Sequence, residues 1–238
     1  MSAHADSARG ATGGKRPARR LSPRQRAPRA ASALGLAGLC LAGLVLTWVV
    51  AYLVPAGQVR DATALHEFTL LGRPQVDTVA NGLLNLLDPL PLTVAAAALI
   101  VVALARGRAR LALAVGLVLA LAPLSAELLK PLLAHSHASV DPTHVFQASW
   151  PSGHSTAALA LAGCALLVAP DRLRPLVAGL GGLFVLSVGA SLLILAWHLP
   201  SDVIGGYLLA GLWVALAVAS LRVAERSRAH GALTRAPL

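Results

Sequence analysis

Residues 175–197 read PLVAGLGGLFVLSVGASLLILAW, a run of 23 residues without a charged side chain. About 20 consecutive apolar residues are enough for a helix to cross a membrane. Uncharged runs of the same kind occupy residues 31–59, 89–105, 111–126, 155–170 and 203–221. Small residues are scattered through all of them, as close packing of membrane helices requires. The pattern predicts an all-α membrane protein, a six-transmembrane-helix bundle in which 89–105 lies at the lower length limit.

The composition of the whole chain agrees with this interpretation. Of 238 residues, 56% are hydrophobic and 13% are charged, and the mean hydropathy is +0.70. Soluble domains carry about 25% charged residues, and disordered chains are poor in apolar residues, so both classes are excluded. Cys40 and Cys164 lie inside apolar runs and indicate neither a disulfide framework nor a cysteine metal site.

Charge divides the chain into three parts. Residues 1–30 are rich in Arg, Ala, Ser and Gly and are expected to form a disordered basic arm. Residues 31–222 are expected to form the six-span membrane domain, and residues 223–238 to form a tail. The uncharged run after the arm exceeds the 7–15 residues of a signal-peptide core, so we expect a retained first span over roughly residues 31–54. The alternatives are a transit peptide or a twin-arginine signal at Arg19 and Arg20.

The basic residues predict the orientation of this bundle. With six spans, both termini and the connections around 106–110 and 170–174 lie on one side, which then holds 17 of the 20 Lys and Arg. By the positive-inside rule both termini are cytoplasmic, in a bacterial plasma membrane. The net charge of +10 is thus explained by topology, and nucleic acid is not an expected partner. The opposite side holds six of the eight histidines, which are His66, His135, His137, His144, His154 and His198.

Two helix starts on this non-cytoplasmic side share proline, serine and histidine, at residues 150–156 (WPSGHST) and 198–202 (HLPSD). Proline suits the first turn of a helix, and a helix N-terminus with open amides binds anions. Both positive dipole ends are expected at the same face, where each start also contributes a histidine. The two helix starts therefore predict a phosphate site that includes Ser152, Gly153, His154 and His198.

Two further residues fit such a site. Asp202 follows His198 by four residues and is expected to hold one imidazole nitrogen, which leaves the other free to attack. Lys130 lies near the outer end of the third span, where a lysine is costly enough to suggest function. Other roles stay open, since Lys130 can pair with Glu127 or reach the interface, Asp202 can complement the helix dipole, and histidines can simply mark a membrane boundary.

Three histidines outside these motifs raise the question of a zinc or copper site. His135, His137 and His144 are loosely spaced, and no cysteine or carboxylate partner stands out near them. We interpret them as unpaired loop histidines, with a metal site as the alternative, and expect neither a metal nor a cofactor.

The motifs together resemble the type-2 phosphatidic acid phosphatase family, which shares its helical core with vanadium haloperoxidases. The family pattern is Lys, six residues, Arg-Pro; then Pro-Ser-Gly-His; then Ser-Arg, five residues, His, three residues, Asp. This chain matches the first block at Lys130, the second at Pro151–His154, and the third at Ser191, His198 and Asp202. The resemblance implies a haloperoxidase-like helical core with the site facing outward.

The resemblance also implies a mechanism that uses no metal. His198 attacks phosphorus and forms a phosphohistidine, Asp202 orients His198, and His154 protonates the departing alkoxide and then activates water. The implied substrate-binding residues are Lys130, Ser152, Gly153 and His137.

The chain departs from the family pattern at both arginines. His137 and Ala138 stand in place of Arg-Pro, and Leu192 stands in place of the second arginine. Neither side chain offers the bidentate fork with which arginine holds phosphate. The remaining arginines on the outer side, Arg60 and Arg73, lie in the first outer loop and are candidates to replace them.

Two functions follow as hypotheses. The first is an integral-membrane phosphatase that acts on a lipid phosphomonoester or polyprenyl diphosphate at the outer leaflet. The second, favoured by His137 and Leu192, is a degenerate family member that binds lipid phosphate or scaffolds partners without hydrolysis. In both, the partners are a membrane lipid phosphate and the bilayer.

Overall fold

The computed structural model describes residues 30–133 and 149–233, and every regular element within these ranges is a helix. The predicted all-α fold class is therefore confirmed. The elements in chain order are α1 (Ala30–Leu53), α2 (Pro55–Thr69), α3 (Pro74–Asn85), α4 (Pro89–Ala105), α5 (Ala109–Leu133), α6 (Gly153–Val168), the 3₁₀ turn η2 (Asp171–Leu173), α7 (Arg174–Ile194) and α8 (Pro200–Leu233).

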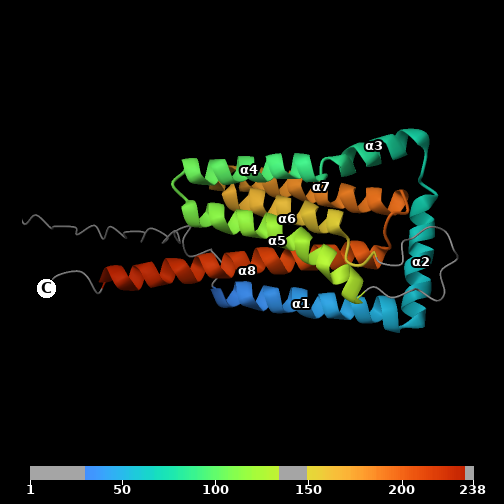
Figure 1. Ribbon diagram of the computed structural model, residues 1–238, viewed down its shortest axis with the longest axis horizontal. Helices are drawn as coiled ribbons and strands as arrows, with labels where there is room; N and C mark the ends of the chain where they lie inside the picture. The colour runs from blue at the N-terminus through green and yellow to red at the C-terminus, as the bar shows by residue number, and fades with distance from the viewer. Residues whose placement is uncertain (1–29, 134–148, 234–238) are drawn as a thin grey trace, which may run out of the picture.

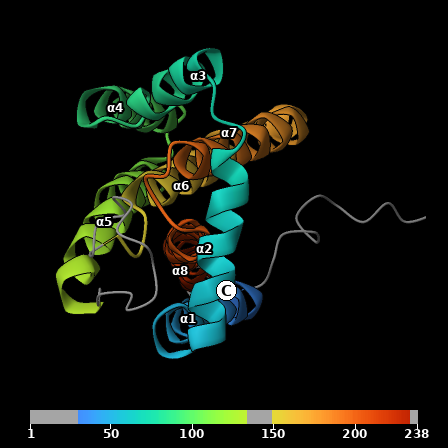
Figure 2. The ribbon, with the colours of Figure 1, turned by 90° about the vertical axis from the view of Figure 1, so that its right-hand side faces the viewer.

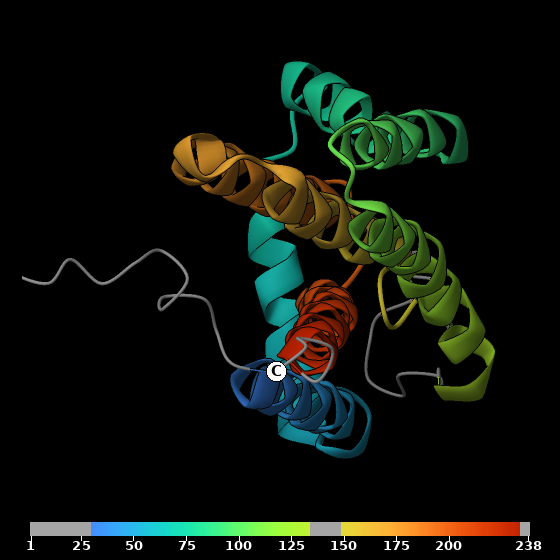
Figure 3. The same cartoon turned by 90° about the vertical axis from the view of Figure 1, so that its left-hand side faces the viewer.

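The long helices lie alongside one another, and α2 runs across one end of the bundle (Figures 1 and 2). Helix α1 packs along α8, while α6 contacts α5, α7 and α8. Helix α1 begins and α8 finishes at the end opposite α2, which Figure 3 views directly. At that end, Arg106 Nη1 donates to the carbonyl of Val168 and Arg110 Nη1 to the carbonyl of Ala224. Much of the basic charge of the described chain is thus gathered at one end.

Four of the described helices are long and apolar enough to cross a membrane: α1, α5, α8 and α7 with its preceding turn. Helices α3 and α4 form a pair bent by 52°, which makes a fifth span if the two count as one. Helix α6 has 16 residues and falls short of that length. The number of spans found by length is therefore four to five, and the count of six stays a prediction.

Side chains are distributed as in a membrane bundle. Large apolar side chains are exposed on the outside of the helices, among them Leu39 on α1, Leu90 on α4 and Leu186 on α7. Small side chains fill the inside, where fully buried positions include Ala103, Ala122, Ala160 and Ala210. Because lipid solvates the outer leucines, helix association depends on close packing of such small residues. The chain is a multi-pass integral membrane protein by these features.

Helix α5 is longer than its uncharged run, which covers 111–126. It continues to Leu133 with Pro123 and Pro131 inside it, and it bends in its second half (Figure 1). A proline removes one helical hydrogen bond and commonly causes such a bend. The last turn of α5 reaches α1, where Trp48 Nε1 donates to the carbonyl of Leu133 at 2.9 Å.

The segment expected to be the first outer loop is instead helical. Both α2 and α3 have a proline in the first turn, Pro55 and Pro74, where its missing N–H costs nothing. Helix α2 contacts α1, α7 and α8, so this segment covers the end of the bundle. That position places Arg60 and Asp61 next to the start of α8.

Candidate active site

The two helix starts that carry the motifs are joined directly. The backbone N–H of Ser152, just before α6, donates to the backbone carbonyl of Asp202 in the first turn of α8 at 3.0 Å. Both residues are fully buried. The structure therefore brings together the two motifs that sequence reasoning placed on one face.

A glycine pair on α8 makes this approach possible. A Cβ atom at Gly206 would collide with Ser155 Oγ and would lie 2.5 Å from the carbonyl oxygen of Ser152. A Cβ atom at Gly205 would lie 2.5 Å from Nε1 of the buried Trp150. Sequence reasoning missed Gly205, Gly206 and Trp150, although two adjacent glycines within one turn after Asp202 could have indicated close helix contact.

The start of α6 is capped within its own turn. Ser152 is the N-cap, and its side chain accepts from the N–H of Ser155 at 3.4 Å. The hydroxyls of Ser155 and Thr156 donate to the carbonyl of Ser152 at 3.1 and 2.7 Å. The first amides of a helix have no intrahelical acceptor, so those of Gly153 and His154 can bind an anion.

His198 and Asp202 form the contact that their spacing predicts. Nδ1 of His198 lies 3.3 Å from Oδ2 of Asp202, and the N–H of Leu199 donates to the same oxygen at 3.0 Å. The Asp202 side chain is fully buried, while 11% of the His198 side chain is exposed. A carboxylate on Nδ1 favours the tautomer in which Nε2 is unprotonated, which is the form needed for nucleophilic attack.

A tight turn at the end of α7 leads into His198. The N–H of Trp197 donates to the carbonyl of Leu192 at 2.9 Å, and the N–H of Ala196 to that of Leu193 at 3.1 Å. This is the Schellman pattern, in which the residue after the C-cap is left-handed. Ala196 occupies that position with φ of 55°, whereas the equivalent turn after α4 uses Gly107. Sequence reasoning missed this turn because glycine is absent from it.

The start of α8 differs from the expectation of a second open helix end. Pro200 has no N–H, the N–H of Leu199 is bound to Asp202, and that of Ser201 donates to Oδ1 of Asp61 at 3.0 Å. The amides of Leu199 and Ser201 at the start of α8 thus already donate to the carboxylates of Asp202 and Asp61. Of these two helix starts, α6 is the one whose first amides have no acceptor among the described residues.

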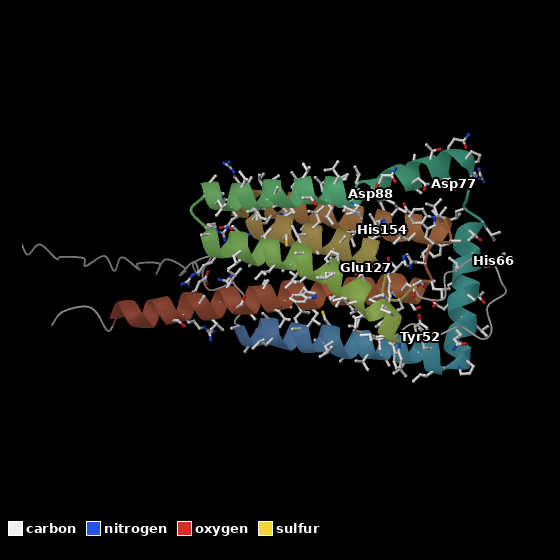
Figure 4. All side chains as sticks on the ribbon, viewed as in Figure 1. Tyr52, His66, Asp77, Asp88, Glu127 and His154 are labelled. Atoms are coloured by element: carbon white, nitrogen blue, oxygen red, sulfur yellow. The ribbon has the colours of Figure 1, made fainter. Side chains whose placement is uncertain are left out.

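His154 lies in the first turn of α6, close to the second histidine motif. Its ring meets that of Trp197 edge to face, with centroids 5.9 Å apart, and His198 and Lys130 lie within electrostatic range of it. His154 also lines a cavity of about 460 Å³ between α4, α5 and α6. Glu127 and Asp88 line the same cavity, and Figure 4 shows them on the part of the bundle that carries His154.

Lys130 forms an ion pair with Glu127, one of the alternatives left open by the sequence. Its Nζ lies 2.7 Å from Oε1 of Glu127. The same Glu127 oxygen lies 2.6 Å from the place that a Cβ at Gly153 would occupy. Lys130 is therefore held through Glu127 beside the open end of α6, so its charge remains near the site.

The other predicted residues are not assembled at this site. Leu192 is fully buried among apolar side chains of α6, α7 and α8. Arg60 lines a separate cavity of about 540 Å³ between α1, α2 and α8, and Arg73 is the exposed N-cap residue of α3. His137, with His135 and His144, lies outside the described residues. Within 30–133 and 149–227, no three His, Cys, Asp or Glu side chains are grouped to hold a metal ion.

Comparison with known proteins agrees with the geometry. Residues 109–226 match the family model of the PAP2 superfamily. The fold is similar to the crystal structure of a transmembrane PAP2-type phosphatidylglycerolphosphate phosphatase from Bacillus subtilis, with a TM-score of 0.62 and 22% identity over 78% of this chain and 94% of that one. No curated relative matches significantly. Through residues 109–226, this chain belongs to the PAP2 superfamily.

Proposed function

We propose that the protein is an integral-membrane phosphatase that hydrolyses a lipid phosphomonoester or a polyprenyl diphosphate. The observation that carries the proposal is the 3.0 Å hydrogen bond from Ser152 to Asp202, because it holds the Pro-Ser-Gly-His helix start against the His198–Asp202 pair. Membership in the PAP2 superfamily and a fold similar to that of a membrane phosphatase support the same class of reaction.

In the first step, Nε2 of His198 attacks phosphorus and the bond from phosphorus to the lipid oxygen breaks. Asp202 orients the imidazole and stabilises the positive charge that develops on it. His154 donates a proton to the departing oxygen. The products are a phosphohistidine and the lipid alcohol, or a lipid monophosphate when the substrate is a diphosphate.

In the second step, water attacks the phosphohistidine. His154, now without its proton, accepts one from that water. The bond between nitrogen and phosphorus breaks, its electrons return to His198, and inorganic phosphate leaves. His154 thus ends the cycle protonated, ready to act again as the acid.

The charge on the phosphoryl oxygens needs donors that are fixed before the reaction. The open amides of Gly153 and His154 at the start of α6 supply them, together with the hydroxyl of Ser152 and the ammonium group of Lys130. His137 is proposed as a further phosphate ligand in place of the family arginine. The scheme needs no metal.

We place the site on the non-cytoplasmic side of a bacterial plasma membrane, with both termini in the cytoplasm. Support comes from the arginines Arg106 and Arg110, which lie at the opposite end of the bundle, since basic loops favour the cytoplasm. The substrate then comes from the outer leaflet. The cavity beside His154 has apolar walls that include Leu92 and Leu119, which suit the first part of a lipid chain.

The test is phosphate release by purified protein in EDTA from phosphatidate, phosphatidylglycerophosphate and polyprenyl diphosphate. The wild type is expected to act on at least one of them, and His198→Ala to lose about 10³-fold or more in kcat. His66→Ala is the matched control, because His66 is an exposed histidine of α2. Unchanged turnover in His198→Ala would refute the mechanism.

A second candidate function is binding of a lipid phosphate without hydrolysis. Two observations favour it: Glu127 holds Lys130, and an apolar side chain fills the buried position of Leu192. Binding of all three lipids with no turnover across a pH series would support this candidate over the first.

A further inference from the structure

Helix α8 begins without a capping side chain at the N-cap position itself, although Asp202 in its first turn accepts the N–H of Leu199. The residue before its first turn is Leu199, which has no oxygen to accept from the open amides, whereas Ser, Thr, Asp and Asn are preferred there. Helix α6 differs, because Ser152 caps it within the same turn. The N–H of Ser201 in the same turn therefore takes its cap from elsewhere.

Asp61 on α2 provides this cap. The N–H of Ser201 donates to Oδ1 of Asp61 at 3.0 Å, and the hydroxyl of Ser201 donates to Oδ2 at 2.5 Å. The two residues are 140 positions apart in the chain. A carboxylate at the N-terminus of α8 also complements the helix dipole. Both oxygens of Asp61 thus bind the residue directly before Asp202.

This contact engages both donors of Ser201 directly beside the carboxylate that holds His198. Oδ2 of Asp202 receives the N–H of Leu199 and faces Nδ1 of His198, while its Oδ1 is buried with no hydrogen-bond partner among the described residues. Without Asp61, the N–H and the hydroxyl of Ser201 would lose their acceptor. The nearest alternative in the sequence is Oδ1 of Asp202, on the next residue. A new bond there would draw the carboxylate from the imidazole.

We propose that Asp61 is a positioning residue, whose carboxylate fastens the first turn of α8 to α2 and thereby fixes Asp202 against His198. The inference rests on the proposed function, since His198 and Asp202 are its central pair. Asp61 lies outside residues 109–226, so the superfamily match does not include it. The active site accordingly depends on α2, which crosses the end of the bundle (Figure 2).

The first readout is independent of turnover. NMR of protein labelled with ¹⁵N-histidine, assigned with His198→Gln, reports the proton on Nδ1 of His198 and its exchange with water. We expect a slowly exchanging signal in the wild type, and its loss or an exchange about tenfold faster in Asp61→Ala. Asp61→Asn retains an acceptor and is expected to keep the signal. Ser201→Ala, which loses only the hydroxyl bond, is expected to fall between them.

The second readout separates positioning from mere stability. A misplaced nucleophile lowers kcat, so Asp61→Ala is expected to lose about 10²-fold in kcat with KM within about twofold of the wild type. Asp61→Asn is expected to recover most of that loss. Glu67→Gln is the matched control, because Glu67 is an exposed acid on the same helix.

The outcomes distinguish this inference from the proposed function. An Asp61→Ala variant with the wild-type NMR signal overturns the inference, as does a wild type without that signal. A signal that depends on Asp61 in a protein that hydrolyses none of the lipids supports the inference and contradicts the proposed function. Equal losses of kcat and of melting temperature in Asp61→Ala and Asp61→Asn indicate a structural role only and overturn it as well.

Discussion

Ser152 and Asp202, 50 positions apart in the chain, are joined by a backbone hydrogen bond of 3.0 Å in a region where both residues are fully buried. The bond links the residue before α6 to the first turn of α8. It sets the distance between the open amides of α6 and the imidazole that Asp202 holds. Changes that separate these two helix starts should therefore affect the chemistry more than the membrane fold.

Gly206→Ala is expected to open this junction. Its Cβ would collide with Ser155 Oγ and with the backbone carbonyl of Ser152, and a backbone atom cannot move away cheaply. We expect a loss of roughly 2 kcal/mol of stability, as for overpacked cores, and about 10²-fold in kcat. Gly182→Ala is the control, because nothing lies within 4 Å of a Cβ at Gly182 on α7. Equal activity of the two variants would show that the contact does not matter.

Ala196→Gly is expected to stabilise the turn before His198. Ala196 has φ of 55°, a left-handed conformation that costs an L-residue with a Cβ about 1 kcal/mol, and glycine removes that cost. Thermal unfolding in detergent should show a higher melting temperature. The reverse change at the equivalent turn, Gly107→Ala, should lower it, since Gly107 has φ of 68°. A lower melting temperature for Ala196→Gly would contradict this interpretation of the turn.

Leu192→Arg introduces the arginine that the resemblance to the family pattern implies at this position, but we expect it to damage the protein. Leu192 is fully buried among apolar side chains, and an unpaired guanidinium there costs roughly 3 kcal/mol or more. Expression and melting temperature should fall, and kcat should not rise. Leu192→Met is the control of similar volume. A folded Leu192→Arg protein with higher kcat would show that this position reaches the site.

Glu127→Gln is expected to strengthen phosphate binding. Glu127 holds Lys130 at 2.7 Å, and in the proposed reaction a substrate phosphate has to compete with this carboxylate for the ammonium group. An exposed pair of this kind is worth up to about 1 kcal/mol, so KM should fall by up to about fivefold. Lys130→Gln should raise KM. If Glu127→Gln also raises KM, Glu127 serves to place Lys130 rather than to compete for it.

The fold was predictable for the segments that must be apolar because they contact lipid. The uncharged runs anticipated α1, α4, α6 and α7 to within a few residues, because a helix in lipid needs apolar side chains on all exposed faces. The continuation of α5 beyond its uncharged run was anticipated as far as Lys130, which was expected near the outer end of the third span, and the helix ends three residues later at Leu133. Helices α2 and α3 were missed because their mixed composition resembles that of a loop.

The convergence of the two helix starts on one face was predictable from their shared proline, serine and histidine, but individual side-chain contacts were predictable only within one turn. His198 and Asp202 are four residues apart, so their contact follows from helix geometry. Asp61 and Ser201 are 140 residues apart, and nothing in the local sequence of either predicts their hydrogen bonds. Such contacts depend on how α2 lies across the bundle, which is decided by tertiary packing.

The most direct test of the proposed mechanism is to trap the covalent intermediate on His198. Purified protein is mixed with a ³²P-labelled lipid substrate in EDTA, quenched in alkali within milliseconds, and digested for mass spectrometry. We predict an alkali-stable, acid-labile phosphate on the peptide that contains His198, and no such label in His198→Gln. A wild type that releases phosphate with no label on His198, or a His198→Gln protein that turns over at the wild-type rate, would contradict it.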